Sequence, residues 1–224
     1  MKIWSRSAVA GFAIGLTVAG CSTATRQTPA GAEPRSPAEQ ARADSGRAAY
    51  TPSDVRFMQG MIRHHAQAIV MAGWAPAHAA REDVKILAGR IAVSQRDEIA
   101  FMERWLRERH ETVPESTAQH DTAGHQMSTS GSSMPELMPG MLTPAQLAKL
   151  SSATGSEFDR LFLTFMIQHH QGALTMVEQL FSSQGAGQEP YVFRFASDVE
   201  IDQNTEIERM RSMLRAAPRS GQNP

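Results

Sequence analysis

Residues 61–71, "MIRHHAQAIVM", recur almost unchanged as "MIQHHQGALTM" at residues 166–176. In each copy, one methionine precedes a pair of adjacent histidines and another methionine follows it. Apolar side chains in and around both copies are spaced three and four residues apart, which predicts an amphipathic α-helix. Because the chain repeats this helix, we expect two copies of a larger structural unit.

The repeated unit is predicted to be a helical hairpin. A first helix begins at Thr51 and Pro52, which suit an N-cap and a first helical position. This helix is expected to end near Gly73 and Pro76, because both residue types interrupt helices. The remaining helices are predicted at residues 82–107, 156–181 and 191–215.

The spacing between the two copies indicates how the hairpins are related. His64 and His169 are 105 residues apart, whereas Glu98 and Glu206, in the second helix of each hairpin, are 108 residues apart. The hairpin turns therefore differ by three residues. The sequence predicts an all-α fold, an up-and-down, ferritin-like four-helix bundle built from two duplicated helical hairpins. The first and third helices are expected to sit diagonally, with both histidine pairs pointing into the core.

Some single positions carry narrower expectations. The second helix should turn Ile86 and Glu98 toward the core, although counting from the hairpin turn places Glu98 more than one turn from His65. A hydrogen bond from Glu98 to an imidazole and a surface salt bridge are both compatible with the sequence. Asp54 and Asp159 are interpreted as first-turn carboxylates that the helix dipole favours.

The two histidine pairs are candidate metal ligands. A single inward histidine is usually a hydrogen-bonded core residue, and a stripe of methionines is usually core packing. Four inward imidazoles are harder to explain in this way, because each buried nitrogen without a partner costs about 1–3 kcal/mol. One metal ion would satisfy several of them. Imidazole with thioether favours copper(I) or silver(I), whereas imidazole alone also accepts copper(II), zinc or nickel.

Length, charge and missing motifs exclude several other functions. The chain has 224 residues, 41% of them hydrophobic, which suffices for the core of one domain. Its formal charge is −1, or −3 (20 − 23) without Lys2 and Arg6, so we expect no nucleic-acid partner. No phosphate-binding loop or nucleophile motif is present. We therefore expect a protein that is not an enzyme.

The N-terminal residues are predicted to direct export. Basic residues precede an apolar stretch at 8–19, which is too short for a permanent membrane helix and fits a signal peptide over 1–20. Cys21, the only cysteine, ends a lipobox-like Val-Ala-Gly-Cys sequence and is the predicted lipidation site, with plain secretion left open. Residues 21–50 would form a flexible tether. We expect the domain on the periplasmic or outer side of a bacterial membrane.

The bundle is assigned to residues 51–216, followed by a tail at 217–224. A linker rich in histidine and methionine, at about 108–142, is either a low-complexity connector or an accessory metal arm. Its candidate ligands are His110, His120, His125, Met127, Met134, Met138 and Met141. At its end, Thr143 and Gln146 form a capping-box pattern that predicts a short helix near residue 150.

Together, these features resemble the bacterial "domain of unknown function 305" family, a ferritin-like bundle of exported proteins. The likeness covers about 51–215 and includes both D-x-x-F-x-x-x-M-x-x-HH-x-x-A-x-x-M phrases, the "MPGM" at 138–141 and two Q-x-x-EI-x-x-M segments. Members of the family are linked to periplasmic binding and tolerance of copper and silver. The resemblance implies as metal ligands Met61, His64, His65, Met71, Met166, His169, His170 and Met176.

The function expected from the sequence is sequestration or relay of copper(I) or silver(I) outside the cytoplasm, with zinc as a further candidate ion. One alternative is a lipid-anchored helical interaction module with structural histidines. Another is a ferritin-like redox enzyme, which is disfavoured because Met61 and Ile62 occupy positions where a di-iron bundle needs glutamate. The expected partners are metal ions and, through lipid on Cys21, a membrane. The sequence is also compatible with a homo-oligomer.

Overall fold

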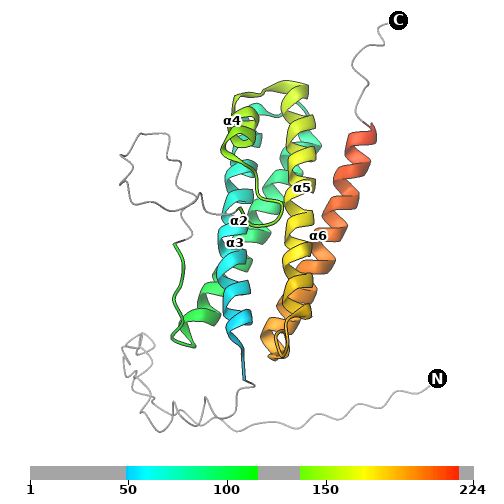
Figure 1. Ribbon diagram of the computed structural model, residues 1–224. Helices are drawn as coiled ribbons and strands as arrows, with labels where there is room; N and C mark the ends of the chain where they lie inside the picture. The colour runs from blue at the N-terminus through cyan, green and yellow to red at the C-terminus, as the bar shows by residue number, and fades with distance from the viewer. Residues whose placement is uncertain (1–48, 116–136, 217–224) are drawn as a thin grey trace, which may run out of the picture. The chain divides into compact units, whose positions relative to one another are not determined.

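The computed structural model describes residues 49–115 and 137–216. Long helices form a bundle in these ranges, and a shorter helix, α4, packs against α2 and α5 (Figure 1). The helices are α2 (Pro52–His78), α3 (Glu82–Arg107), α4 (Pro144–Ser152), α5 (Gly155–Ser182) and α6 (Pro190–Ala216). The predicted four-helix bundle of two hairpins, α2–α3 and α5–α6, is confirmed.

Most helix ends lie where the sequence placed them, but the end of α2 does not. The helix continues through Gly73 and Pro76 to His78. A proline removes a single backbone donor and usually stops a helix. Here tertiary contacts hold the last turn, because Ala75 is fully buried and His78 Nδ1 lies 2.8 Å from the Ala153 carbonyl oxygen. The expected end near Gly73 and Pro76 was therefore wrong.

Several sequence predictions fall outside the described residues. They concern the signal peptide, most of the tether, the C-terminal tail, and the side chains of Cys21, His120, His125, Met127 and Met134. The capping box before α4 is confirmed: the Thr143 side chain accepts from the Gln146 backbone N–H, and Gln146 Oε1 accepts from the Thr143 backbone N–H. Within the described ranges, no helix is both long and apolar enough to span a membrane.

The two hairpins enter the bundle from opposite ends. In Figure 1, α2 rises from the bottom of the view while α5 descends from the top. Hydrogen bonds between the hairpins fix this direction. Asp54 Oδ1, at the start of α2, accepts from the Gly187 N–H in the α5–α6 turn at 2.7 Å. Asp159, at the start of α5, accepts from the Ala80 and Arg81 N–H groups in the α2–α3 turn, each at 3.1 Å.

The connection between the hairpins therefore crosses the length of the bundle, as it does in ferritin-like folds. Helices α2 and α5 are antiparallel and pack directly against each other. They are neighbours, so the expectation that they would sit diagonally was wrong. Asp54 is a first-turn residue of α2, as interpreted, and it also binds the turn of the other hairpin. For Asp159 the interpretation was wrong, because α5 begins at Gly155 and Asp159 lies beyond its first turn, where it binds the α2–α3 turn.

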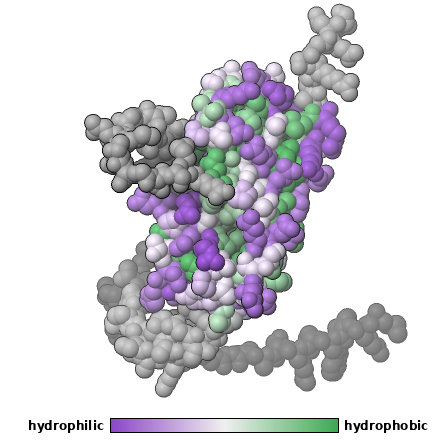
Figure 2. Space-filling view, viewed as in Figure 1, coloured by the Kyte–Doolittle hydropathy of each residue, from purple (hydrophilic) through white to green (hydrophobic). Residues whose placement is uncertain are grey.

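Apolar side chains fill two clusters, one toward each end of the bundle. On the face that Figure 2 shows, hydrophilic residues cover most of the outer surface, and hydrophobic residues are visible between the helices. Ile86 was expected in the core but is 46% exposed. Its neighbours Val84 and Leu87 are buried instead, because one residue rotates a helical side chain by about 100°.

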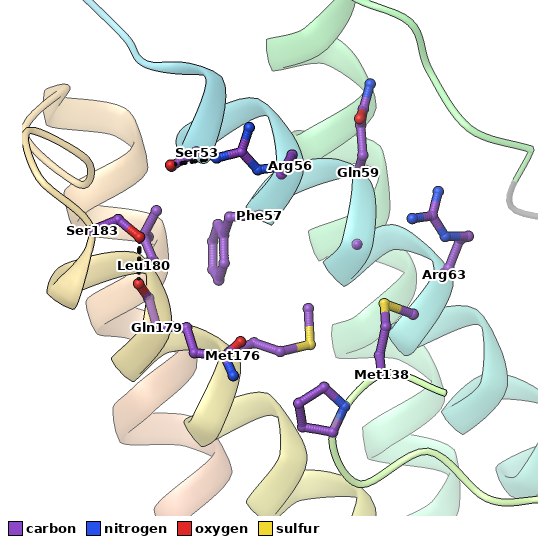
Figure 3. A pocket seen from close by; sticks show the side chains of 12 residues that line it. Ser53, Arg56, Phe57, Gln59, Arg63, Met138, Met176, Gln179, Leu180 and Ser183 are labelled. Atoms are coloured by element: carbon purple, nitrogen blue, oxygen red, sulfur yellow. Dashed lines mark hydrogen bonds between the residues drawn. The ribbon is translucent and has the colours of Figure 1, made fainter. Parts of the chain in front are cut away.

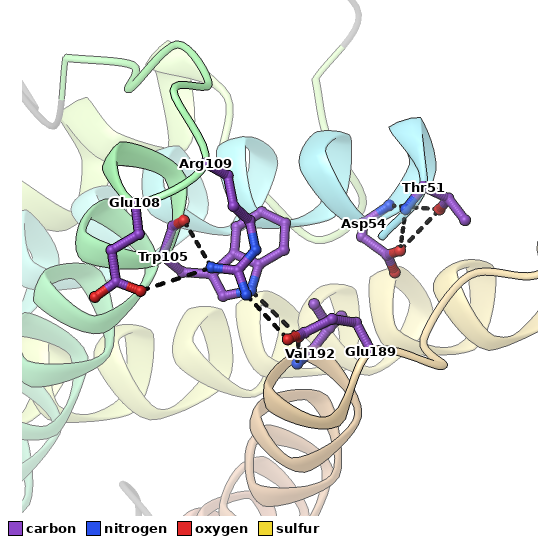
Figure 4. Close-up of polar contacts among 7 residues, drawn as sticks. All are labelled: Thr51, Asp54, Trp105, Glu108, Arg109, Glu189 and Val192. Carbon is purple, nitrogen blue, oxygen red and sulfur yellow. Dashed lines mark hydrogen bonds and ion pairs between the residues drawn. The ribbon is translucent and has the colours of Figure 1, made fainter. Parts of the chain in front are cut away.

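A buried ion pair joins the ends of the hairpins at the bottom of the bundle (Figure 4). Arg109 Nη2 donates to Glu189 Oε1 at 3.0 Å, and the two side chains are 4% and 2% exposed. Glu189 Oε2 also accepts from Trp105 Nε1 and from the Val192 backbone N–H. The guanidinium lies 4.2 Å from the Trp105 ring centroid. This contact links the end of α3 to the start of α6.

Candidate metal centre

The structure gathers the four predicted histidines between the two apolar clusters. All four side chains are fully buried. The His64 and His169 rings meet at the α2–α5 contact, with 3.8 Å between their centroids. His65 lies 6.3 Å from His64, and His170 lies 6.4 Å from His169, measured in the same way. The imidazoles therefore form a row from His65 through His64 and His169 to His170.

The four predicted methionines are also buried, but they do not surround a single point. Met61 and Met176 belong to one apolar cluster, whereas Met71 and Met166 belong to the other. This follows from the antiparallel contact, which sets an early residue of α2 level with a late residue of α5. Met61 and Met71 are ten residues apart, or about 15 Å along the helix axis. One thioether pair therefore lies on each side of the histidine row.

His65 and His170 each bind a glutamate of the partner helix in their own hairpin. His65 Nε2 lies 2.5 Å from Glu98 Oε2, and His170 Nε2 lies 2.6 Å from Glu206 Oε2. The prediction that Glu98 lies more than a turn from His65 was wrong, because counting from a turn neglects the tilt between packed helices. The glutamates are 17% and 22% exposed. Each glutamate therefore lies between a fully buried imidazole and the solvent.

These contacts define the state of the rings. Each glutamate carboxylate accepts the Nε2 proton of its histidine, so the neutral form of His65 or His170 carries its lone pair on Nδ1. Burial tends to raise the pKa of the Glu98 carboxyl, but the hydrogen bonds and charge of His65 and the hydrogen bond of Ser94 outweigh it and lower the pKa. Glu98 is thus a stable anionic acceptor for the imidazole proton.

His64 is held by the end of the linker. Its Nε2 lies 3.0 Å from the Pro139 carbonyl oxygen. The same segment is fixed to α2 by Gln67, whose amide bonds both the N–H and the carbonyl of Leu142. It also crosses α5 at Gly172, where a Cβ atom would lie 2.0 Å from the Pro139 oxygen. A glycine is therefore required at position 172 for the linker to cover the histidine row.

Five imidazole nitrogens in this row have no hydrogen-bond partner. They are His64 Nδ1, His65 Nδ1, His169 Nδ1, His169 Nε2 and His170 Nδ1. Burial, followed by the proximity of His65, lowers the pKa of His64 to about 3. Burial and the neighbouring imidazoles hold the pKa of His169 well below its ordinary value. These two rings are consequently neutral at physiological pH and present lone pairs rather than positive charge.

An open groove of about 400 Å³ lies between α2 and α5 (Figure 3), and none of the four histidines lines it. Pro139 and the thioethers of Met138 and Met176 line it. A Cβ atom on Gly60 would lie 3.2 Å from Met176 Cε and 3.5 Å from Met138 Sδ, so both thioethers lie at this glycine. Met138 was predicted as part of the linker, and the structure places it beside a predicted ligand.

The centre is not a preformed cage of hard ligands. Across residues 49–115 and 137–216, no three His, Cys, Asp or Glu side chains are arranged to hold a metal ion. What the centre offers is a close pair of neutral imidazoles with thioethers nearby. Nitrogen and thioether donors without thiolate suit soft monovalent ions, which tolerate few ligands. The donor set therefore fits copper(I) or silver(I) better than zinc.

Sequence reasoning missed Pro139, Gln67 and Gly172. The carbonyl oxygen of Pro139 carries no side-chain signal, but its place in "MPGM" marked the segment. Gln67 and Gly172 occupy equivalent positions in the two copies and differ. Of the two alternatives that the sequence left open for Glu98, the structure shows the hydrogen bond to an imidazole, and Glu206 makes the equivalent bond to His170.

Comparisons with known proteins agree with this architecture. The model of the family described as domain of unknown function (DUF305) matches residues 54–214. A crystal structure of a DUF305 fragment from Deinococcus radiodurans is 31% identical, covering 76% of this chain and all of that chain, with a TM-score of 0.60. No curated protein sequence matches the chain.

Structures of CopM are also similar. The Cu(II)-bound form is 29% identical, covering 73% of this chain and 96% of that chain, with a TM-score of 0.55. The Ag-bound form obtained by co-crystallization is 26% identical, covering 74% and 97%, with a TM-score of 0.53. CopM has also been solved in a Cu(I)-bound form. With a family match across nearly the whole bundle and a relative of more than 30% identity, this chain belongs to the DUF305 family.

Proposed function

We propose that this protein binds copper(I) or silver(I) in the bundle core and thereby sequesters or relays these ions, contributing to metal tolerance. His64 and His169 would be the first ligands, because they are the closest pair of imidazoles and both are buried and neutral. His65 and His170 would follow through Nδ1. The observation that carries the proposal is the set of five partnerless imidazole nitrogens in one dry place.

The surroundings of the histidines support this role. A metal-binding histidine usually donates its second ring N–H to a carboxylate or a backbone carbonyl, which orients the ring. Glu98, Glu206 and the Pro139 carbonyl do this for three of the four rings. In a protein without metal, each unsatisfied nitrogen costs about 1–3 kcal/mol. An ion would remove that penalty for several nitrogens together.

The methionines would supply soft ligands on either side of the imidazoles. Met61 and Met176 lie on the side of the open groove, together with Met138. Met71 and Met166 lie in the opposite cluster. Entry of the ion through the Met138–Met176 groove would therefore place thioethers before imidazoles on its path. That CopM has been solved with copper and with silver bound supports the choice of ion.

No redox or hydrolytic step is part of this proposal. A di-iron bundle has four glutamates and Glu-x-x-His motifs, whereas here one glutamate from each hairpin, Glu98 or Glu206, binds a histidine of the row. We accordingly propose a binding protein rather than an enzyme. Export and attachment through lipid on Cys21 remain predictions, which mass spectrometry of the mature N-terminus would test in wild type and Cys21→Ser.

The test is metal loading followed by analysis of bound metal. Wild-type protein should retain copper(I) or silver(I) in competition with zinc, and the double variant His64→Leu, His169→Leu should lose most of this uptake while circular dichroism shows the helices intact. His78→Leu is the matched control, since His78 binds the Ala153 carbonyl outside the row. Equal silver uptake by the double variant and the control would refute the proposed centre.

A further inference from the structure

The groove between α2 and α5 carries positive charge beside its thioethers. Arg56 and Arg63, both on α2, line it together with Met138 and Met176, and no acidic residue is among the lining residues. Neither guanidinium has a carboxylate partner in the described ranges, because Arg56 donates only to the Ser53 hydroxyl and Arg63 makes no hydrogen bond or ion pair there. The groove therefore holds two positive charges that none of its lining residues neutralises.

The two arginines flank the place where the thioethers meet α2. Arg56 and Arg63 are seven residues apart, which is about 10 Å along the helix axis and nearly the same face. Gly60 lies between them, and a Cβ atom there would lie 3.2 Å from Met176 Cε and 3.5 Å from Met138 Sδ. In Figure 3, both arginines extend from α2, while Met176 comes from α5 and Met138 from the end of the linker. A ligand on the thioethers would therefore lie at a level of α2 between the two charges.

These charges oppose the approach of a bare metal cation. Copper(I) and silver(I) are positive, so two unpaired guanidinium groups raise the energy of the free ion at this groove. A path for a bare cation is expected to be lined by negative charge. The groove between α3 and α6 has such a lining, from Glu98, Asp202 and Glu206, but it has no methionine or histidine. The thioethers and the carboxylates therefore line different grooves.

An anionic complex of the ion matches both the charge and the sulfur ligands of the α2–α5 groove. Soft monovalent ions form anionic complexes with soft ligands such as chloride, cyanide, thiolates and thiosulfate. On the basis of the proposed function, we infer that this groove receives copper(I) or silver(I) as an anionic complex, which Arg56 and Arg63 attract before Met138 and Met176 bind the ion. The arginines thereby select the chemical form in which the ion arrives.

The transfer is a ligand exchange without a redox step. When bis(thiosulfato)argentate(I) is the donor, each thioether that binds silver displaces one thiosulfate dianion. The complex, with three negative charges, becomes a singly positive silver ion held by two thioethers, and two thiosulfate dianions leave to the solvent. Neutral thioethers therefore replace anionic ligands of similar softness.

Dicyanoargentate(I) tests the docking step alone, because cyanide holds silver too tightly for thioethers to displace it. The full chain without metal is dialysed against this anion at low ionic strength, where charges are least screened. Wild type is compared with the double variant Arg56→Gln, Arg63→Gln and with the control Arg90→Gln, Arg209→Gln. The control removes the same two charges from exposed arginines of the α3–α6 groove, neither of which makes an ion pair in the described ranges.

We expect the Arg56→Gln, Arg63→Gln variant to bind dicyanoargentate about tenfold more weakly than wild type, because a cleft lined by one sign of charge concentrates ions of the opposite sign by a factor of about 10–10³. The control should bind nearly as well as wild type. No binding by wild type would overturn the inference. Equal weakening in both double variants would also overturn it, because the effect would then follow net charge rather than the groove.

The rate of silver uptake separates this inference from the proposed function. Silver(I) is supplied either as the anionic thiosulfate complex or as the cationic diammine complex, and retained silver is measured after rapid gel filtration. In the Arg56→Gln, Arg63→Gln variant, uptake should become slower from the anionic complex and faster from the cationic one. The same change with both complexes, or no change, would overturn the inference. Wild type that binds dicyanoargentate through these arginines but retains no silver from either labile complex would contradict the proposed function and leave the docking site standing.

Discussion

The two halves of the bundle are alike at one pair of histidines and unlike at the other. His65 and His170 bind equivalent glutamates at 2.5 and 2.6 Å. His64, in contrast, binds the Pro139 carbonyl, whereas His169 has no partner for either nitrogen. The duplication thus supplies a symmetric scaffold, and the linker breaks its symmetry by covering one side. The result is one imidazole oriented by a hydrogen bond, facing one whose two nitrogens have no hydrogen-bond partner and which packs against the His64 ring.

The largest expected effect concerns acid and the two central rings. His64 has a pKa of about 3 in the folded protein and 6.5 as its ordinary value. Between pH 6.5 and pH 3, His64 is protonated in the unfolded chain but neutral in the folded chain. The free energy of unfolding therefore falls as the pH is lowered from 6.5 toward 3. A shift of this size corresponds to about 5 kcal/mol for His64 alone.

Urea unfolding of the metal-free protein at a series of pH values would measure this loss. The double variant His64→Leu, His169→Leu should show a much flatter dependence over the same range. An unchanged slope in the double variant would mean that other groups carry the acid sensitivity.

A smaller effect is expected where the linker crosses α5. In Gly172→Ala the new Cβ would lie 2.0 Å from the Pro139 oxygen, so the linker must move off the helix. We expect a loss of about 3 kcal/mol, at the upper end of values for overpacking. Gly89→Ala is the control, since a Cβ there meets nothing within 4 Å, and it should stabilise α3 by about 0.5–1 kcal/mol. Thermal unfolding of both variants would measure this difference in stability. Equal melting temperatures would contradict the close contact between the Pro139 segment and α5 at Gly172.

Replacing each central histidine separately should expose the asymmetry directly. In the metal-free protein, His169→Leu removes two unsatisfied nitrogens, whereas His64→Leu removes one and leaves the Pro139 carbonyl without its donor. We therefore expect His169→Leu to be more stable than His64→Leu by about 1–2 kcal/mol. Urea midpoints would show this, and the reverse order would argue that the Pro139 contact contributes nothing.

The smallest difference is expected between the two glutamates. Glu98→Gln and Glu206→Gln should each weaken silver binding by about 10–100-fold, because each loses the carboxylate that orients a ligand. Since the two pairs have the same geometry, the variants should agree with each other within about threefold. Competition with a silver chelator measures both. A strong effect of one variant alone would show that only one half of the row binds the ion.

The sequence predicted the parts of this centre that repeat. The doubled Met-x-x-His-His phrase and its helical spacing were enough to place four imidazoles inside a four-helix bundle. The bounds of α3 were also predicted to the residue. These features could be predicted because they depend on the spacing of apolar residues and on the internal repeat. Both can be seen in the sequence.

The remaining features depend on where distant segments meet. The direction of α5 against α2 depends on contacts between the two hairpins, such as those of Asp54 and Asp159, which helical periodicity does not encode. The position of Glu98 along the bundle axis, relative to His65, depends on the angle at which α2 and α3 pack. Pro139 contacts His64 through its backbone carbonyl oxygen. The tendency of Pro76 to end α2 is outweighed by tertiary contacts of the last turn, such as that of His78 with the Ala153 carbonyl oxygen. None of these follows from the helix pattern alone.

The reciprocal bonds of Asp54 and Asp159 have a consequence for how the duplicated gene product can behave. Each hairpin completes the other, because the carboxylate that binds a turn always comes from the opposite half. A polypeptide carrying a single half would leave its own turn unbound and uncover the apolar face that its twin protects. We therefore expect a separated half to fold stably only when a second half, of either kind, binds its turn and covers its apolar face.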